Sequence, residues 1–166
     1  MQNEELTVRK PSGRKPINWG KVLRWGAVGV LVLAVLIQFV PYGRNHTNPA
    51  VIMEPTWDSP QTRQLAVRAC YDCHSNETAW PWYTNVAPIS WLTQHDVDDG
   101  RHELNFSEWN RPQKTDDIVN SVRDGEMPPA IYLPTHPNAN LSTGDRQALI
   151  QGLTATFGPG GQLGGR

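Results

Sequence analysis

The chain has 166 residues, with 15 Lys and Arg, 16 Asp and Glu, and only two cysteines. This length suits one domain of ordinary size with an additional segment. Residues 1–24 hold six basic residues against two acidic ones, a net charge of +4, whereas residues 45–166 hold eight against fourteen, a net charge of −6. An acidic main domain argues against nucleic acid as its partner.

The N-terminal part of the chain contains a candidate membrane anchor. We expect residues 1–18, which are polar, to be a disordered cytoplasmic tail, and residues 19–42 to be a transmembrane anchor, because Trp25–Val40 carries no charge. This stretch is short for a span of about 20 residues, but apolar and aromatic neighbours on both sides extend it. The alternative is a cleaved signal peptide, but no A-x-A-like cleavage site follows the apolar stretch.

The charge asymmetry predicts the orientation of this anchor. Six basic residues precede the apolar stretch, and only Arg44 follows it closely. Positive flanks stay in the cytoplasm, so the N-terminus is expected there and the main domain on the outer side. We therefore expect a single-pass protein of a bacterial inner membrane with a periplasmic or otherwise extracytoplasmic domain.

The rest of the chain is expected to be an all-α domain wrapped around a cofactor. Residues 43–56 contain two prolines and no periodicity, which is typical of a linker, residues 57–158 form the domain, and residues 159–166 are a Gly-rich flexible tail. Long alternating strands are missing from the sequence. The predicted helices run from Ser59-Pro60 to about Cys73, from about Ser90 with Gly100 ending or bending the helix, over about Asp116–Asp124 before Gly125, and from Ser142 to Gly158.

The most informative motif is Cys70-Tyr71-Asp72-Cys73-His74. Cys-x-x-Cys-His is the attachment signature of c-type haem, in which two thiols bond the porphyrin and the histidine ligates iron. A structural zinc site would need a second Cys/His pair, and a thioredoxin-like motif would need a βαβ pattern. A plain disulfide would not explain the histidine. The motif therefore predicts one covalent haem c with its iron.

Iron needs a sixth ligand or an open position, and Met127 is the best candidate for this ligand. It lies in Gly125-Glu126-Met127-Pro128-Pro129, where the prolines hold it out of a helix, as a thioether ligand on a rigid loop requires. The alternative is that Met127 fills a gap in the core. Met53 precedes the motif and is a poor candidate, and the rival ligands are His95, His102 and His136.

The aromatic residues that follow the motif are further cofactor-binding candidates. Trp80, Trp82 and Tyr83 either wall the pocket or donate hydrogen bonds to a propionate. Arg101 either neutralises a propionate or is a surface charge.

Six segments of the chain carry a resemblance to a known family: CYDCHSNET (70–78), WPWY (80–83), APISWL (87–92), GRHELNFSEW (100–109), GEMPP (125–129) and HPNANLS (136–142). Together they resemble the haem-binding domain family of single-haem cytochrome c-like proteins. The resemblance implies a cytochrome c-like fold, with Cys70 and Cys73 as the attachment points and His74 as the axial ligand, and Met127 matches the Met-Pro motif of the family. One departure is Gly152-Leu153, where such domains often carry a Trp-Leu pair, so weaker closing contacts are expected there.

The favoured function is electron transfer by a membrane-anchored single-haem cytochrome. His/Met coordination raises the reduction potential and needs no substrate pocket, and the expected partner is a redox protein in or at the membrane. One alternative is a haem enzyme or sensor with an open or displaceable sixth position, although the sequence shows no distal His/Arg pair. Another is an accessory subunit with a structural haem.

Overall fold

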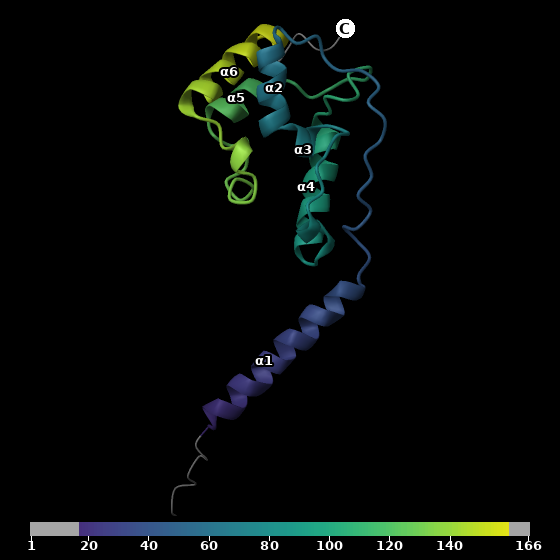
Figure 1. Ribbon diagram of the computed structural model, residues 1–166, viewed down its shortest axis with the longest axis vertical. Coiled ribbons are helices and arrows are strands. Elements are labelled where there is room, and N and C mark those ends of the chain that lie inside the picture. Colours follow the sequence, from purple (N-terminus) through teal and green to yellow (C-terminus); the bar gives the residue numbers. More distant parts are fainter. Residues whose placement is uncertain (1–16, 160–166) are drawn as a thin grey trace, which may run out of the picture. The chain divides into compact units, whose positions relative to one another are not determined.

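The computed structural model describes residues 17–159 (Figure 1). The predicted tails, residues 1–18 and 159–166, lie almost wholly outside the described residues. The contacts divide the chain into two units, residues 1–39 and residues 40–166, and each unit is described by itself.

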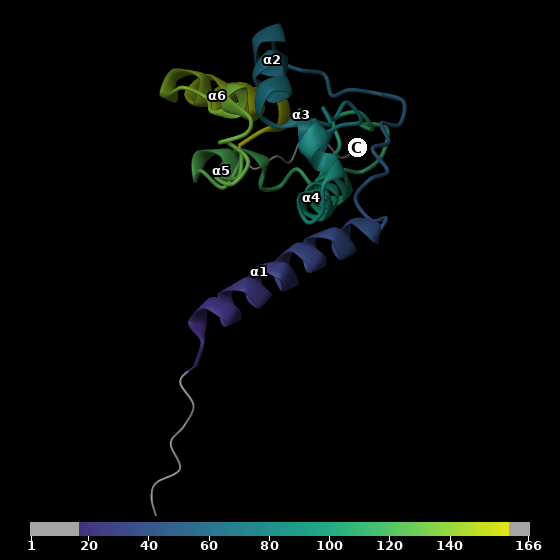
Figure 2. The ribbon, with the colours of Figure 1, turned by 60° about the horizontal axis from the view of Figure 1, so that its bottom comes forward.

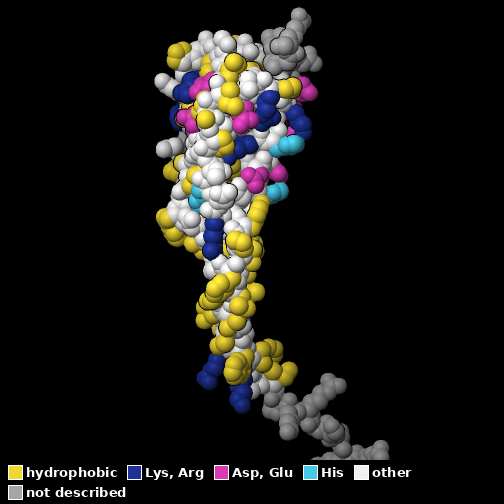
Figure 3. Space-filling model, turned by 90° about the vertical axis from the view of Figure 1, so that its right-hand side faces the viewer, with side chains coloured by type: hydrophobic (Ala, Val, Ile, Leu, Met, Phe, Trp, Pro, Cys, Tyr) yellow, Lys and Arg dark blue, Asp and Glu magenta, His cyan; other side chains and the backbone are white. Residues whose placement is uncertain are grey.

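The described part of the first unit is helix α1, Trp19–Leu36, which continues into the 3-10 turn η1, Ile37–Phe39. The helix begins at Asn18, whose side-chain oxygen accepts a hydrogen bond from the backbone N–H of Lys21 at 3.1 Å. Hydrophobic side chains cover the length of α1 in Figure 3. Its 21-residue stretch Trp19–Phe39 has a mean hydropathy of 2.1, so it is long and apolar enough to cross a membrane.

The second unit is helical, as the sequence predicts. Within residues 17–159 there is no strand, only an isolated parallel bridge between Met53 and Glu108. In Figures 1 and 2, α6 lies beside α2 and α5, and α3 meets one end of α4. The elements are α2 (Pro60–Ala69), α3 (Tyr71–His74), η2 (Trp82–Asn85), α4 (Ile89–Glu103), α5 (Ile118–Arg123), η3 (Pro137–Ala139) and α6 (Thr143–Phe157).

Side-chain caps explain where two of these helices begin. The Ser59 hydroxyl accepts a hydrogen bond from the N–H of Thr62 at 3.2 Å, with Pro60 at the first helical position. The Ser142 hydroxyl accepts from the N–H of Asp145 at 3.0 Å. Glycine ends the last helix, because Gly158 follows α6 with a φ of 86° that other residues rarely adopt.

Two helix boundaries differ from the prediction. The helix expected to reach about Cys73 stops at Ala69, because Cys70 leaves helical geometry with φ −127° and ψ −33°, and the chain then restarts as α3. The second difference is α4, which neither ends nor bends at Gly100 but continues to Glu103. Gly100 is buried, and its lack of a side chain serves close packing rather than helix termination.

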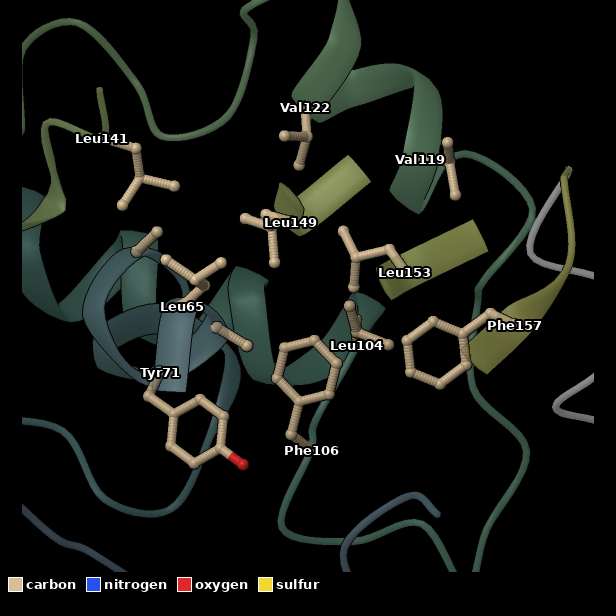
Figure 4. Close-up of a cluster of buried hydrophobic side chains, with 12 residues drawn as sticks. Leu65, Tyr71, Leu104, Phe106, Val119, Val122, Leu141, Leu149, Leu153 and Phe157 are labelled. Carbon is tan, nitrogen blue, oxygen red and sulfur yellow. The ribbon is translucent and has the colours of Figure 1, made fainter. Parts of the chain in front are cut away.

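The core lies between α2, α5 and α6 and the segment that follows α4 (Figure 4). Phe106 and Phe157 are fully buried, and the rings of Trp57 and Trp109 pack against them at centroid distances of 5.0–6.0 Å. Gly152 lets α2 and α6 approach closely, since a Cβ at this position would overlap the side chain of Thr62. The other labelled core residues are Leu65, Tyr71, Leu104, Val119, Val122, Leu141, Leu149 and Leu153.

The segment 43–56, predicted as a linker, is fastened to the folded unit at several points. The Asn48 side chain donates to the carbonyl of Thr78 at 2.9 Å. Near its end, Glu54 accepts two hydrogen bonds of 2.6 Å from Arg63 of α2, one of 3.1 Å from Trp57 and one of 3.2 Å from Tyr71. The guanidinium of Arg63 and these neutral donors hold the pKa of Glu54 below its usual value despite partial burial.

We expect Glu54→Gln to lower the free energy of unfolding by about 1–3 kcal/mol at neutral pH, because it removes the charge paired with Arg63 and leaves one acceptor oxygen in place of the two that serve Arg63, Trp57 and Tyr71. A carboxyl with a lowered folded-state pKa stabilises the fold above its unfolded value of 4.5 and loses that effect as the pH falls through the folded-state value. The stability gap between wild type and variant should therefore shrink as the pH falls below about 4.5. Urea unfolding at several pH values measures the gap.

Glu77→Gln is the matched control for this experiment, because Glu77 is exposed and makes no salt bridge with the residues that the structure describes. A gap that stays constant down to acid pH would show that the charge of Glu54 does not stabilise the fold.

Candidate cofactor site

A cavity of about 370 Å³ opens in the second unit where α3, α4, α5 and α6 come together. This volume falls in the range of ordinary ligand pockets. Exposed charged residues belong to its lining: Glu103, Lys114, Asp116 and Asp117. Most of the remaining lining is apolar, and the full set of these other residues is Cys70, His74, Leu104, Phe106, Ile118, Ser121, Val122, Met127 and Leu153.

The two cysteines lie on either side of the break between α2 and α3. The N–H groups of Cys73 and His74 both donate to the carbonyl of Cys70, at 3.2 and 2.9 Å, so one tight turn carries both thiols and the imidazole. The thiols are not bonded to each other. Burial, and to a smaller extent nearby negative charge, raises the pKa of each thiol to about 12. In the folded chain both sulfurs therefore carry their protons at neutral pH.

His74 is held by the last turn of α4. Its Nδ1 lies 3.0 Å from the carbonyl oxygen of Gly100 and 3.1 Å from that of Leu104. A carbonyl oxygen only accepts hydrogen bonds, so Nδ1 must carry the proton, and the lone pair of Nε2 is free to bind a metal ion. Burial lowers the pKa of His74 although the two carbonyls act in the opposite direction, which keeps the imidazole neutral, as a metal ligand requires.

A polar network fixes the loop that follows His74. The carbonyl of His74 accepts from the N–H of Phe106 at 2.8 Å. Asn76 accepts from the side chain of Asn105 at 2.8 Å, and its own N–H donates to the hydroxyl of Ser107 at 2.9 Å. Asn76, Asn105 and Ser107 are all buried. This network and the α4 carbonyls hold the imidazole from two directions, which is the outer-shell support that metal-binding histidines have.

Gly100 is a site residue whose role the sequence analysis missed. A Cβ at Gly100 would lie 2.9 Å from the carbonyl carbon of Cys73 and 3.0 Å from its Cβ. Only glycine allows α4 to pass this close to the backbone of the motif. The signal in the sequence was a glycine inside a helical pattern, which can mark close packing as well as a helix end.

Met127 lines the same cavity as Cys70 and His74. It follows Gly125, whose φ of 79° turns the chain away from α5. The N–H groups of Glu126 and Met127 both donate to the carbonyl of Ser121, at 2.9 and 3.0 Å, which fixes the backbone of this turn. The structure therefore brings a thiol and an imidazole from the motif, and a thioether from a segment more than 50 residues later, to one cavity.

The predicted aromatic contacts do not line this cavity. Trp80 stacks on His46 with ring centroids 4.4 Å apart and donates to Asn48 at 3.2 Å. Trp82 is 79% exposed. The hydroxyl of Tyr83 lies 3.3 Å from Nε2 of His136. None of these three side chains belongs to the lining of the cavity, and their role toward a cofactor stays a prediction.

Arg101 is also outside the cavity lining. Its guanidinium donates to the carbonyls of Ser75 and Thr47 at 2.8 and 3.0 Å, to Asn48 at 2.9 Å and to the hydroxyl of Thr78 at 2.8 Å. These four acceptors tie the segment 43–56 to the loop after the motif. Arg101 thus organises the chain around the motif, and its role toward a propionate stays a prediction.

The rival histidines do not line the cavity either. His95 is exposed and lies 3.3 Å from Asp99. His102 is exposed on the last turn of α4. His136 stacks on Tyr132 with ring centroids 3.7 Å apart. Within the described residues no three or more His, Cys, Asp or Glu side chains form a metal-binding group.

The cavity also contains residues that no motif marks. Leu104 and Phe106 come from the segment after α4, and Lys114 contacts Glu103 at 2.6 Å between their charged atoms. Sequence reasoning could have found Leu153 as part of the buried stripe of the last helix. Nothing in the sequence indicated Lys114, because the place of this residue in the lining depends on its contact with Glu103 at the end of α4.

Fold and site together define a helical protein with a cavity whose donor atoms can hold a metal-bearing cofactor. The chain belongs to the haem-binding domain family, whose model matches residues 32–155. The cofactor that this membership supports is haem with its iron, and the donors in the cavity fit it, since imidazole and thioether are both known axial ligands. No curated protein and no solved structure matches the chain.

Proposed function

We propose that the chain is a membrane-anchored cytochrome with one haem c, held covalently by Cys70 and Cys73 and ligated by His74 and Met127, and that it transfers electrons. The observation that supports this proposal most is the position of His74 and Met127 in the lining of one cavity that also contains Cys70. When bound there, the haem would supply a one-electron redox couple.

The residues of this chain have clear roles in such a site. His74 presents Nε2 to the haem iron, while its Nδ1–H donates hydrogen bonds to two main-chain carbonyls. Met127 supplies a neutral thioether, which together with histidine favours a raised reduction potential. The apolar side chains of Leu104, Phe106 and Val122 keep water from the cavity wall, and a dry environment also shifts the potential.

Helix α1 supports the membrane part of the proposal. Its 21-residue apolar stretch is long enough to span, and six basic residues precede it or lie in its first turns. The positive-inside rule then favours a cytoplasmic N-terminus and a periplasmic haem domain, which is the side where haem is attached to such motifs in bacteria.

The charges of the cavity lining suggest the kind of redox partner. Glu103, Asp116 and Asp117 are exposed there, against one cation, Lys114. A partner with a basic patch around its own cofactor would be attracted to this surface, and its rate of electron exchange should fall as salt is added. We propose a redox protein of this type in or at the same membrane.

A haem sensor or enzyme is the second candidate, and one observation favours it. Met127 is 37% exposed, so the sixth ligand would lie at an accessible edge, where a small molecule could displace it. Rapid binding of carbon monoxide to the reduced wild type would favour this candidate, and failure to bind would favour electron transfer.

Met127→Ala tests the proposed coordination. The oxidised wild type should show the weak far-red band of methionine-ligated ferric haem, and the variant should lose it. The midpoint potential should fall by on the order of 0.1 V, within the span of about 0.8 V that axial ligands set. A reduced-minus-oxidised spectrum and a redox titration measure both effects.

Met53→Ala is the matched control, because Met53 is 52% exposed and is not part of the cavity lining. It should keep the band and the potential of the wild type. If Met127→Ala also keeps them, Met127 is not the ligand.

A further inference from the structure

One end of the folded unit carries an exposed apolar face. We define this face as Trp82, Val86, Ile89 and Leu92, which are 79%, 41%, 46% and 45% exposed. The N–H of Ser90 donates to the carbonyl of Val86 at 2.9 Å, so the turn of Val86 leads directly into α4. Ile89 and Leu92 are three residues apart and lie on the same side of the helix.

This face is free of charged side chains over an unusual length. Residues 78–94 contain no Asp, Glu, Lys or Arg, in a part of the chain with a net charge of −6. The next residues of α4 are different, since Asp96, Asp98 and Asp99 follow within two turns. The helix is therefore apolar at its N-terminal end and acidic beyond it. An exposed tryptophan with aliphatic neighbours and no anions is the composition found at membrane interfaces.

The chain enters the folded unit at this same end. Gly43 is buried, with a φ of 78°, and a Cβ there would overlap the carbonyl of Ser90 and lie 2.9 Å from the nitrogen of Trp91. Three residues later, Nε2 of His46 lies 3.1 Å from the carbonyl of Thr84. The first residues after the anchor are thus fixed to η2 and to the first turn of α4.

Connectivity then limits the distance between the apolar face and the lipid. Phe39 ends the apolar stretch of α1, and four peptide units separate it from Gly43. A fully extended chain covers at most about 3.3–3.6 Å per residue, so Gly43 must lie within about 15 Å of the end of that stretch. The headgroup layer of one leaflet alone is about 5–7 Å thick, so the tether is short enough for the face to reach the depth of interfacial aromatics.

We propose that the apolar face of Trp82, Val86, Ile89 and Leu92 docks on the lipid surface of the membrane that α1 spans. This inference rests on the proposed anchor. The carbonyls of Gly100 and Leu104, which hold His74 in the cavity, lie at the other end of α4. The 15 residues of this helix span about 22 Å. Docking through the N-terminal end of the helix therefore leaves the acidic lining of the cavity open to the proposed redox partner.

Photocrosslinking in native membranes tests this docking with the full, haem-loaded chain. p-Benzoylphenylalanine replaces Trp82 or Ile89 in the test variants, and the product after illumination is analysed by mass spectrometry for phospholipid adducts. The matched control position is Ile52, which is 62% exposed. Its N–H donates to the carbonyl of Ser107, a residue that follows the C-terminal end of α4. Leu31 within α1 is the control for the anchor itself.

We expect phospholipid adducts at Trp82 and Ile89 at least fivefold above those at Ile52, and adducts at Leu31. Adducts at Leu31 with none above background at Trp82 and Ile89 would leave the anchor in place and overturn the docking. Adducts of these two positions with a protein instead of lipid would also overturn it. Absence of lipid adducts at Leu31 would refute the anchor, and the docking with it.

A charged variant gives an independent check. Ile89→Glu combined with Leu92→Glu changes only exposed positions, so the haem spectrum should stay that of the wild type. The adducts at Trp82 should fall at least fivefold, because two carboxylates resist entry into the interface. Unchanged labelling of Trp82 in this variant would contradict the docking.

Discussion

In cells that mature c-type cytochromes, the combined variant Cys70→Ala and Cys73→Ala should contain only polypeptide of the bare mass, while the wild type should carry the additional mass of one haem. Acid–acetone extraction should leave the pigment on the wild type. The reason is simple, since these two are the only cysteines in the sequence, and a thioether bond to haem needs a thiol. Intact-protein mass spectrometry measures the difference.

The raised pKa of the two thiols limits unrelated modifications that would change the measured mass. Burial raises the pKa of both to about 12, so in the folded chain they are poor nucleophiles that pick up few adventitious adducts. Met127→Ala serves as the control, because it alters a proposed ligand but neither attachment point and should keep the covalent mass. Wild-type protein whose pigment is stripped completely by acid–acetone would end the case for haem c.

Gly100→Ala should lower the free energy of unfolding by about 2–3 kcal/mol, as overpacking of a tight contact does. The added methyl group would overlap the carbonyl oxygen of Cys73 and lie 2.9 Å from its carbonyl carbon, and the backbone cannot move aside as a flexible side chain could. Helix α4 would have to shift away from α3, which would also disturb the two hydrogen bonds to Nδ1 of His74. Urea unfolding and the haem spectrum report the two effects.

Gly144→Ala is the matched control for this substitution. Gly144 lies in the first turn of α6. A Cβ added there would lie 3.9 Å from the Ser142 hydroxyl oxygen, the nearest atom. There the change should be neutral or should stabilise by up to about 1 kcal/mol through helix propensity. If Gly100→Ala is as stable as Gly144→Ala, the close approach of α4 to Cys73 is not what requires glycine.

The sequence predicted those features of the fold that depend on local chemistry. The capping serines Ser59 and Ser142 mark helix starts because their hydroxyls accept hydrogen bonds from the N–H groups three residues ahead. The break at Cys70 was missed because the apolar spacing continues through it, and only packing of the next turn on α4 shows where the helix ends. Gly100 was misread for the same reason, since its role depends on a neighbour 27 residues earlier in the sequence, Cys73.

In the candidate site too, local chemistry could be predicted from the sequence, whereas contacts between distant residues could not. Cys70, His74 and Met127 were predicted from the chemistry of their residue types, and the structure brings all three to one cavity. Trp80 and Arg101 were further cofactor-binding candidates; both bond to Asn48, and their role toward a cofactor stays a prediction. This partner lies in the segment that the sequence analysis treated as a linker, so its packing could not be foreseen from periodicity.

The hydrogen bonds behind His74 restrict how this protein can evolve. Both acceptors of its Nδ1 proton are main-chain oxygens, of Gly100 and Leu104, whereas many metal-binding histidines donate to a carboxylate side chain. No exchange of one side chain for another can remove or strengthen such an acceptor directly. Variation in the electronic character of this imidazole must then come through shifts of the helix terminus, and under the proposed coordination a change of potential is reached more readily by substitution of Met127.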